Sequence, residues 1–396
     1  MRVGIIGQGY VGLTISLSAA KVGHSVVGFD LNDALVSSLN SAKSHIEDVT
    51  DRALESIIKN KTYKASFEAK DLEGCEVIIV AVPTPLDEER NPDLSFLHSA
   101  VELIRQNVKS PALIINESTS YPGTLRNEIA ARLEGVEHSF ASSPERIDPG
   151  NKEWTTKNTP RLVGGLTPEA LAKAREFYGS FCDDIIEVSS PEVAEAAKIF
   201  ENTFRQVNIA LVNEFAQIAY ALGISGREVI DAAATKPYGF MPFNPGPGVG
   251  GHCIPVDPSY LAHVANQVGV PATFIKRANE VNLAMPAYVV ERVIAGSGGS
   301  IKGKKVVVVG VSYKSNIADT RETPAAAVID LLRDQGASVA WHDDLVGSWR
   351  GESSLPIAGA DIAVVVTKHD GVNLAAINAC GYVFDCTGQV AGVDGI

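Results

Sequence analysis

The sequence has few cysteines and lacks the paired spacing that disulfide frameworks and zinc sites require. Its 396 residues contain five cysteines, and no two of them stand in a C-x-x-C arrangement. An odd number of widely spaced cysteines fits neither a disulfide-stapled secreted domain nor a structural zinc site. We therefore expect a reducing, cytoplasmic compartment and no bound metal. The cysteines are Cys75, Cys182, Cys253, Cys380 and Cys386.

Long apolar runs and a surplus of positive charge are also absent. No apolar run approaches the ~20 residues that span a bilayer. The sequence starts on a strand-like segment, so we expect neither a membrane anchor nor a signal peptide. The formal net charge of −13 argues against a nucleic-acid or anionic-membrane surface, although a local basic pocket for phosphate remains compatible with it.

The pattern of apolar segments predicts an α/β protein of two or three domains. Strand, helix and strand patterns at 2–6, 10–22 and 25–29 form a βαβ unit, which later strands extend into a parallel, doubly wound sheet. A long helix without glycine or proline follows from about residue 191, and after the loop rich in glycine and proline we expect further helix from about 258 to 296. The glycine- and serine-rich break GSGGS precedes a second strand-and-helix alternation. We predict Rossmann-like domains at 1–190 and 300–396, joined by a central helical domain at 191–299.

The first βαβ unit carries a dinucleotide-binding pattern. In GQGYVG, Gly7, Gly9 and Gly12 follow the G-x-G-x-x-G spacing between a strand and a helix, which allows a tight turn and close approach to a pyrophosphate. Asp30 ends the second strand, where a carboxylate can bind both ribose hydroxyls. The two residues after Asp30 carry no positive charge for a 2′-phosphate. The pattern therefore predicts NAD rather than NADP, and the 1–190 domain is expected to bind it.

One cysteine lies in a segment rich in glycine and proline, PGPGVGGHCIPVDP at 245–258. Glycines at 248, 250 and 251 allow the backbone to pass close to a ligand, which makes Cys253 a candidate nucleophile. A small thiol packed beneath a turn is the competing interpretation.

Other polar residues occupy positions suited to a cleft. Lys198, Asn202 and Arg205 are spaced to share one face of the long helix, and a partly desolvated Lys198 would have a lowered pKa suited to proton transfer. The alternative is a solvated face. The segments EST (117–119) and SPERIDPG (143–150) follow predicted strands, where doubly wound sheets bind ligands.

Taken together, these segments resemble those of the nucleotide-sugar 6-dehydrogenases, the UDP-glucose/GDP-mannose dehydrogenase family. The resemblance covers nearly the whole chain. Within the family, the SPERIDPG, FRQVNIALVNE and GGHCIPVDP segments are most similar to UDP-N-acetylglucosamine 6-dehydrogenases, and UDP-N-acetylmannosamine dehydrogenases come next. His252 and Val256 depart from the GGSCFPKD-like segment of UDP-glucose enzymes. The further motifs behind the resemblance are VPTP (82–85), ESTSYPGT (117–124), KIFENTFRQVNIALVNE (198–214) and VSYKSNIADTRETP (311–324).

The resemblance implies a four-electron oxidation of the sugar C6 alcohol to a carboxylate with two NAD molecules in turn. Cys253 would be the nucleophile that retains the aldehyde as a thiohemiacetal and then a thioester. Lys198 and Asn202 would stabilise the oxyanion at C6, and Asp257, Thr119 and Glu145 would assist through water. Whether Lys198 or a water on Asp257 takes the first alcohol proton stays open.

The resemblance also implies binding roles and a homodimer built on the long helix. The C-terminal domain would bind the nucleotide part of the sugar through Lys314, and Arg321 would reach the NAD pyrophosphate. The implied cofactor residues are Gly7, Gly9, Tyr10, Val11, Gly12, Asp30, Thr84, Thr119 and Arg321. The implied substrate residues are Glu145, Arg146, Lys198, Asn202, Arg205, Phe243, Gly246, Gly250, Gly251 and Lys314.

Two other functions fit parts of the sequence. A two-electron dehydrogenase of the hydroxyacid type also joins a dinucleotide domain to a helical domain with a Lys and Asn pair. It needs neither Cys253 nor a third domain. A nucleotide-sensing or scaffold protein could keep NAD binding without turnover, and production of NADH would exclude it.

Overall fold

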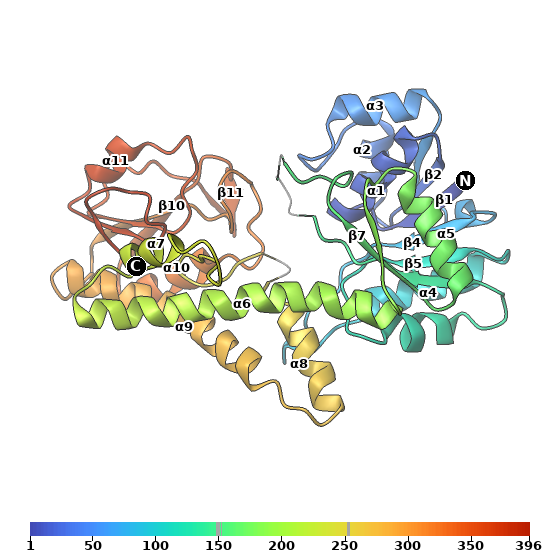
Figure 1. Ribbon diagram of the computed structural model, residues 1–396. Helices are drawn as coiled ribbons and strands as arrows, with labels where there is room; N and C mark the ends of the chain where they lie inside the picture. Colours follow the sequence, from blue (N-terminus) through green and yellow to red (C-terminus); the bar gives the residue numbers. More distant parts are fainter. Residues whose placement is uncertain (148–150, 152, 252–253) are drawn as a thin grey trace. The chain divides into compact units, whose positions relative to one another are not determined.

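The computed structural model describes residues 1–147, 151, 153–251 and 254–396 (Figure 1). These residues form two compact units, Met1–Glu201 and Asn202–Ile396. The helix α6 (Pro191–Leu222) begins in the first unit and ends in the second. Its length agrees with the predicted long helix, which has no glycine or proline to interrupt it.

The first unit contains one sheet of eight strands, in the order β3-β2-β1-β4-β5-β6-β7-β8. The first six strands in this order pair in parallel, as the sequence predicts. β7 then pairs antiparallel to β6, a reversal that the sequence did not predict, and β8 returns to a parallel pairing. The strands are β1 (Arg2–Ile6), β2 (Ser25–Phe29), β3 (Tyr63–Ser66), β4 (Val77–Val80), β5 (Leu113–Asn116), β6 (Ser139–Ser142), β7 (Arg161–Gly165) and β8 (Ile185–Glu187).

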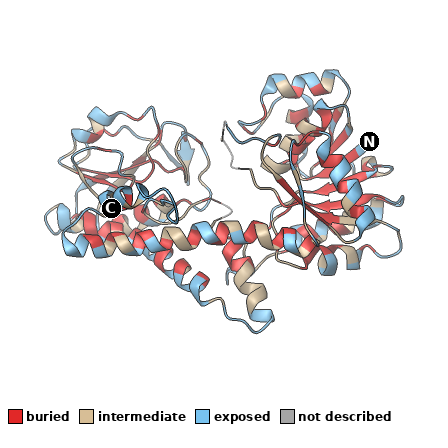
Figure 2. Cartoon of the chain, in the orientation of Figure 1, coloured by how far each residue is buried: buried red, intermediate tan, exposed pale blue. Residues whose placement is uncertain are grey.

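Helices cover this sheet, and its strands are largely buried (Figure 2). Side chains alternate between the two faces of a strand. Val3, Ile5, Val77 and Ile79 share one face and belong to a cluster with residues of α1, α2, α3 and α5. The helical segments are α1 (Tyr10–Lys21), α2 (Asp33–Asn40), α3 (Asp51–Lys59), α4 (Ser95–Asn107), α5 (Pro168–Gly179) and the short turns η1 (Ala69–Leu72), η2 (Leu125–Ile129) and η3 (Ala130–Arg132).

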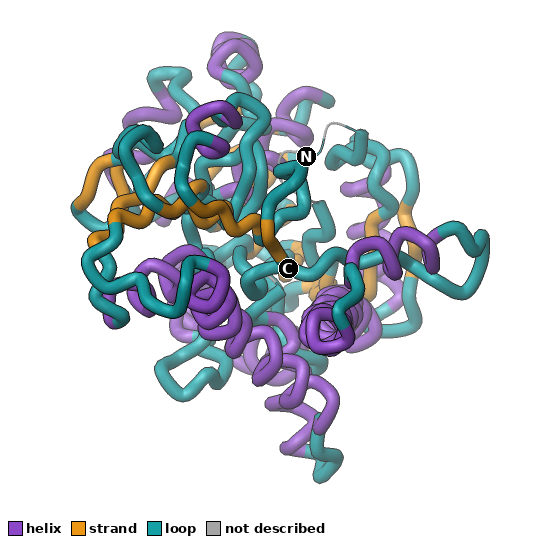
Figure 3. The backbone as a smooth tube through the Cα atoms, turned by 90° about the vertical axis from the view of Figure 1, so that its left-hand side faces the viewer, coloured by secondary structure: helices purple, strands orange, loops and turns teal. Residues whose placement is uncertain are grey.

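The second unit contains a smaller, parallel sheet in the order β10-β9-β13-β14-β15. Figure 3 shows these strands in orange between purple helices. Alternate residues of β9 face opposite sides: Val306 and Val308 join the core cluster with α9 and α10, whereas Val307 and Val309 join the cluster with α11. The strands are β9 (Lys305–Val309), β10 (Ser338–His342), β11 (Ser348–Trp349), β12 (Glu352–Ser353), β13 (Ile362–Val365), β14 (Tyr382–Asp385) and β15 (Asp394–Gly395).

The helices between α6 and the second sheet agree with the predicted pattern except at one break. We expected continuous helix from about 258 to 296, but α8 ends at Gln267 and α9 begins at Thr273. Gly269 follows α8 with a positive φ of +76°, and Pro271 cannot donate a backbone hydrogen bond. The helices are α7 (Gly226–Ala234), α8 (Asp257–Gln267), α9 (Thr273–Gly296), α10 (Pro324–Asp334) and α11 (Leu374–Asn378).

Candidate active site

The glycine-rich turn after β1 has the geometry of a dinucleotide-binding turn. Gly7 has a φ of +91°, and a side chain there would collide with the backbone of Ala81. A side chain on Gly12 would collide with the carbonyl of Gly7. Gly9 directly precedes α1 and has open space around the position of a Cβ atom. A pyrophosphate can therefore approach the amino end of α1, where backbone N–H groups favour anions.

Asp30 lies at the end of β2 and remains partly exposed. Its Oδ2 accepts the N–H of Gln8 at 2.8 Å, and its Oδ1 accepts the N–H of Asn32 at 3.0 Å. Each carboxylate oxygen has a second lone pair, so two ribose hydroxyls can still bind. Leu31 and Phe67 follow neighbouring strands and are 76% and 51% exposed, which offers apolar surface to an adenine ring. Sequence reasoning missed both, and the signal in the sequence was only an apolar residue shortly after each strand.

The other predicted cofactor residues of the first unit occupy neighbouring positions. Tyr10 and Val11 are half-buried in the first turn of α1. Thr84 is buried after β4, and Thr119 is half-buried after β5. The N–H of Val82 donates to Ser118 Oγ at 2.9 Å. The segments after these two adjacent strands are thereby tied together, and with the glycine turn and Asp30 they fit a bound NAD.

A buried group of charged side chains includes residues that follow β5 and β6. Arg161 Nη1 lies 3.1 Å from Glu117 Oε2, and Arg161 Nη2 lies 2.6 Å from Glu145 Oε2. Tyr178 donates its hydroxyl hydrogen to Glu117 Oε1 at 2.5 Å. Burial raises the pKa of Glu117 to about 7, although the charge of Arg161 opposes this shift. Sequence reasoning missed Glu117, Arg161 and Tyr178 as a group.

Glu145 and Arg146, both predicted site residues, are held in place by several bonds. Glu145 Oε1 accepts the N–H groups of Arg146 and Ile147 at 2.7 and 2.9 Å. Burial alone would raise the pKa of Glu145, but Arg161 and these N–H groups lower it. Arg146 pairs with Glu201 on α6 at 2.6 Å. Glu145 is therefore held as a carboxylate, and its assisting role in proton transfer stays a prediction.

Replacing Arg161 with glutamine should destabilise the protein by about 3–5 kcal/mol, because two buried carboxylates would lose their shared cation. Equilibrium unfolding in urea, followed by fluorescence and circular dichroism, measures the loss. The matched control is Arg175→Gln, which breaks an exposed pair with Glu187 and should cost about 0–1 kcal/mol. Equal effects of the two substitutions would contradict a structural role of the buried group.

The first part of α6 carries Lys198, and both Lys198 and the nearby Glu195 are buried. The carboxylate oxygens of Glu195 accept the N–H groups of Gly123 and Leu125 at 2.7 and 2.9 Å. These bonds anchor the segment after Thr119 to α6 one turn before Lys198. Sequence reasoning missed Glu195, whose partners lie about 70 positions earlier in the chain.

In the second unit, Asn202 and Asp257 are brought together. Asn202 Nδ2 donates to Asp257 Oδ2 at 2.5 Å, and the two residues are 6% and 1% exposed. Asp257 begins α8, so its carboxylate lies where the helix dipole favours negative charge. The alternative interpretation, a solvated helix face, is therefore wrong for Asn202 and for Lys198, which is 8% exposed. It holds for Arg205, which is exposed.

The glycine- and proline-rich loop is pinned at both described ends. Gly246 donates its N–H to Asn213 Oδ1 at 2.9 Å, and Pro245 O accepts from Arg227 at 3.1 Å. Gly251 donates its N–H to the carbonyl of Arg321 at 3.1 Å. A side chain on Gly250 would press on Tyr313, Pro324 and Glu322. Cys253 and His252 lie outside the described residues.

The remaining predicted substrate and cofactor residues of the second unit lie on its loops. The ring of Phe243 contacts Phe204 edge to face, with centroids 5.8 Å apart. Lys314 is half-buried on the loop after β9. Arg321 is exposed and pairs with Asp319 through Nε and Nη2. The predicted reach of Arg321 to a pyrophosphate stays a prediction.

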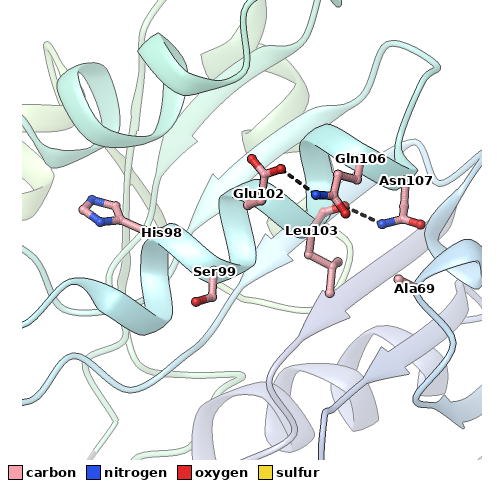
Figure 4. Close-up of a pocket in the computed structure, with 7 residues that line it drawn as sticks. All are labelled: Ala69, His98, Ser99, Glu102, Leu103, Gln106 and Asn107. Atoms are coloured by element: carbon pink, nitrogen blue, oxygen red, sulfur yellow. Dashed lines mark hydrogen bonds between the residues drawn. The ribbon is translucent and has the colours of Figure 1, made fainter.

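One open hollow of the first unit contains none of the predicted site residues. It has a volume of about 550 Å³ and lies along α4 (Figure 4). Its polar side chains bond to one another, as Gln106 does to Glu102 at 2.6 Å. None of its lining residues is a predicted site residue: Ala69, His98, Ser99, Glu102, Leu103, Gln106 and Asn107. Across the described ranges, no cluster of His, Cys, Asp or Glu could hold a metal ion, and no helix is long and apolar enough to cross a membrane.

Comparison with known proteins agrees with this geometry. Family models match three consecutive parts of the chain, all from the UDP-glucose/GDP-mannose dehydrogenase family. They are the NAD binding domain at 1–182, the central domain at 192–284 and the UDP binding domain at 307–390. NAD is therefore the cofactor, as the glycine turn and Asp30 predict.

Individual relatives cover most of the chain. A UDP-N-acetyl-D-mannosamine dehydrogenase of Pyrococcus horikoshii is 34% identical over 93% of this chain and 90% of its own. A UDP-N-acetyl-D-glucosamine 6-dehydrogenase of Pseudomonas aeruginosa is 38% identical over 84% of this chain and 80% of its own. The solved structure of a UDP-D-ManNAc dehydrogenase from Pyrococcus horikoshii matches with a TM-score of 0.90 and 32% identity, covering 100% of this chain and 99% of that one. The chain belongs to the UDP-glucose/GDP-mannose dehydrogenase family and is an NAD-dependent nucleotide-sugar dehydrogenase.

Proposed function

We propose that this enzyme oxidises the C6 hydroxyl of a UDP-N-acetylhexosamine to the uronic acid, and that the sugar is UDP-N-acetylglucosamine. The sequence of the cysteine loop supports an N-acetylated sugar over glucose, because His252 and Val256 depart from the UDP-glucose pattern. Relatives with the glucosamine and the mannosamine names both align over most of the chain. UDP-N-acetylmannosamine is therefore the second candidate substrate.

The reaction removes four electrons and balances with one water. The alcohol loses a hydride from C6 and a proton from its oxygen, and the Cys253 thiolate adds to the resulting aldehyde carbon. The thiohemiacetal loses a second hydride from C6 and a proton, which leaves a thioester that water hydrolyses to the acid. NAD bound to the first domain would supply the hydride acceptor for both oxidations. The aldehyde thus stays bound between the two oxidations.

The buried pair of Asn202 and Asp257 is the observation that carries this proposal. Its amide and carboxylate meet at 2.5 Å at the start of α8, four residues after Cys253. A buried carboxylate at this point can hold a water for proton transfer and for thioester hydrolysis. The Asn202 amide can stabilise negative charge on the C6 oxygen. Lys198, also buried on α6, would exchange the proton.

We assign one role to each of the three predicted domains. The 1–190 domain would hold NAD, the 191–299 domain would supply the cysteine loop, and the 300–396 domain would bind the nucleotide through Lys314. Glu145, Arg146, Arg205 and the loop at 243–251 would contact the sugar nucleotide. Arg321 would bind the NAD pyrophosphate, and Thr119 would assist the acid–base chemistry.

We also expect a cytoplasmic homodimer built on α6. Apolar side chains at intervals of seven residues along α6 are exposed: Phe204 by 42%, Leu211 by 62% and Ile218 by 49%. Such a stripe fits a second copy of the same helix. Sedimentation velocity at micromolar concentration should give the mass of a dimer or a multiple of it, and a monomer would contradict this expectation.

Replacing Asp30 with alanine should raise KM for NAD about ten- to a hundredfold, since two hydrogen bonds to a charged group are lost. The preference for NAD over NADP should fall as well, because the carboxylate no longer repels a 2′-phosphate. Steady-state kinetics with each cofactor measures both. Asp33→Ala removes an exposed acid from the start of α2 and serves as the control. An unchanged KM for NAD in Asp30→Ala would reject the ribose contact.

A panel of nucleotide sugars tests the substrate. We expect the highest kcat/KM with UDP-N-acetylglucosamine, followed by UDP-N-acetylmannosamine and UDP-N-acetylgalactosamine. UDP-glucose and GDP-mannose should be poor substrates. A preference for the mannosamine sugar would move the assignment to the second candidate. Turnover of UDP-glucose at the highest rate would overturn the N-acetylhexosamine proposal.

A further inference from the structure

The second unit repeats the glycine turn and the acidic residue of the dinucleotide site, but this acidic residue, Asp343, is buried. Gly310 directly follows β9 and has a φ of +83°, as Gly7 directly follows β1 with a φ of +91°. β10 is followed by Asp343, as β2 is followed by Asp30. Asp343 is only 5% exposed, however, whereas Asp30 is partly exposed. The acidic residue after the second strand of each βαβ pattern is therefore accessible to a ligand in the first unit and buried in the second.

The Asp343 carboxylate is saturated by bonds from its own unit. Its Oδ2 accepts the N–H groups of Val311 and Ser312 at 2.8 and 3.2 Å and the Ser312 hydroxyl at 2.9 Å. Its Oδ1 accepts the N–H groups of Leu345 and Val346 at 2.9 and 3.0 Å. Burial alone would raise the pKa of Asp343, but these bonds and His369 lower it. No acceptor capacity is left for ribose hydroxyls.

His369 contacts the Asp343 carboxylate and also bonds to the loop at 312–316. The whole residue is only 3% exposed. Its Nε2 lies 3.1 Å from Asp343 Oδ1 and 3.0 Å from Ser312 Oγ. Its Nδ1 lies 2.8 Å from the backbone nitrogen of Asn316, which can only donate. Nδ1 is therefore the acceptor, and Nε2 carries the ring hydrogen toward Asp343.

Both ends of a five-residue segment, 312–316, thus bond to one imidazole, and Lys314 lies at its centre. Asn316 has a φ of +64°, a conformation that asparagine adopts more readily than most residues. Its side chain exchanges two hydrogen bonds of 3.0 Å with Asp370, the neighbour of His369. His369 and Asp370 therefore set the shape of the loop that presents Lys314.

We propose that His369 is a positioning residue for nucleotide recognition. It occupies the carboxylate of Asp343 and fixes the loop that carries Lys314. This inference rests on the proposed function, in which Lys314 contacts the nucleotide. A loop that is already ordered loses little conformational entropy when the nucleotide binds, so the nucleotide binds more tightly. His369 would act on binding and not on the oxidation at C6.

Isothermal titration of the full-length protein with UDP tests the inference. His369→Ala should raise the Kd for UDP about tenfold, with an unchanged Kd for NAD. KM for the UDP-sugar should rise by a similar factor while kcat changes less than about twofold, a split that general destabilisation does not produce. His342→Ala is the matched control, because His342 bonds to Leu355 O and Asp344 at 2.9 and 3.2 Å and its loss should leave UDP binding unchanged.

A second variant keeps the test decisive if His369→Ala does not fold. Asp370 is exposed, so Asp370→Ala should fold and should still loosen Asn316, raising the Kd for UDP about threefold. Unchanged UDP binding in the folded variants would overturn the inference, as would a loss of kcat without a change in KM. Absence of UDP binding by the wild-type protein would instead overturn the proposed role of this unit in nucleotide binding.

Discussion

Replacing Cys253 with serine should lower the rate of uronic acid formation by at least about a thousandfold, the scale seen when a covalent nucleophile is removed. A serine hydroxyl is a far weaker nucleophile than a thiolate unless a base activates it. The aldehyde would then not be captured for the second oxidation. Binding of the UDP-sugar should be nearly unchanged, because the two side chains have similar size.

Intact-protein mass spectrometry and titration calorimetry separate these effects. The wild-type protein quenched during turnover should carry a sugar adduct, and Cys253→Ser should carry none while it binds substrate with a similar Kd. The control is Cys380→Ser, which changes a half-buried cysteine at the end of α11 and should keep full activity. Full turnover by Cys253→Ser would rule out the covalent mechanism.

Replacing Asp257 with asparagine should lower kcat about a hundred- to ten-thousandfold, the range expected for loss of a general acid–base group. The substitution keeps the size of the side chain and its ability to accept a hydrogen bond from Asn202. The fold should therefore persist, while the negative charge that holds and activates a water is lost. Single-turnover kinetics should show the larger effect on hydrolysis of the thioester, and covalent enzyme should accumulate.

The control for Asp257→Asn is Glu169→Gln, which removes an exposed carboxylate from the first turn of α5. It changes the charge at the start of a helix in a similar way and should leave kcat unaltered. If Asp257→Asn turned over at the wild-type rate, the buried pair with Asn202 would be structural, and the proton transfer would have to be assigned to Lys198.

Local sequence signals predicted most of the fold. β1, α1 and β2 begin at the expected residues because the apolar strands and the glycine turn between them are local features. The break between α8 and α9 was also encoded locally, in Gly269 and Pro271, and was overlooked. The antiparallel step from β6 to β7 has no local signal, since it depends on which edge of the sheet a later strand joins.

The positions of candidate site residues were predictable where their spacing along a single helix or strand determines which face they share. Lys198 and Asn202 share a helix face by their spacing of four residues, but their burial depends on segments that pack on the helix from elsewhere. Asp343 illustrates the same limit, because its position after a strand suggests a ribose acceptor. Only contacts with His369 and the 311–312 backbone reveal that its oxygens are occupied.

The amount of NADH formed per mole of sugar tests the central claim most directly. With limiting UDP-N-acetylglucosamine and excess NAD, the proposed double oxidation predicts two NADH for each sugar consumed and no free aldehyde. One NADH per sugar would mean that the aldehyde escapes after a two-electron step, which would contradict the role of Cys253. If UDP-N-acetylmannosamine alone gave two NADH, the mechanism would stand and the substrate assignment would be wrong.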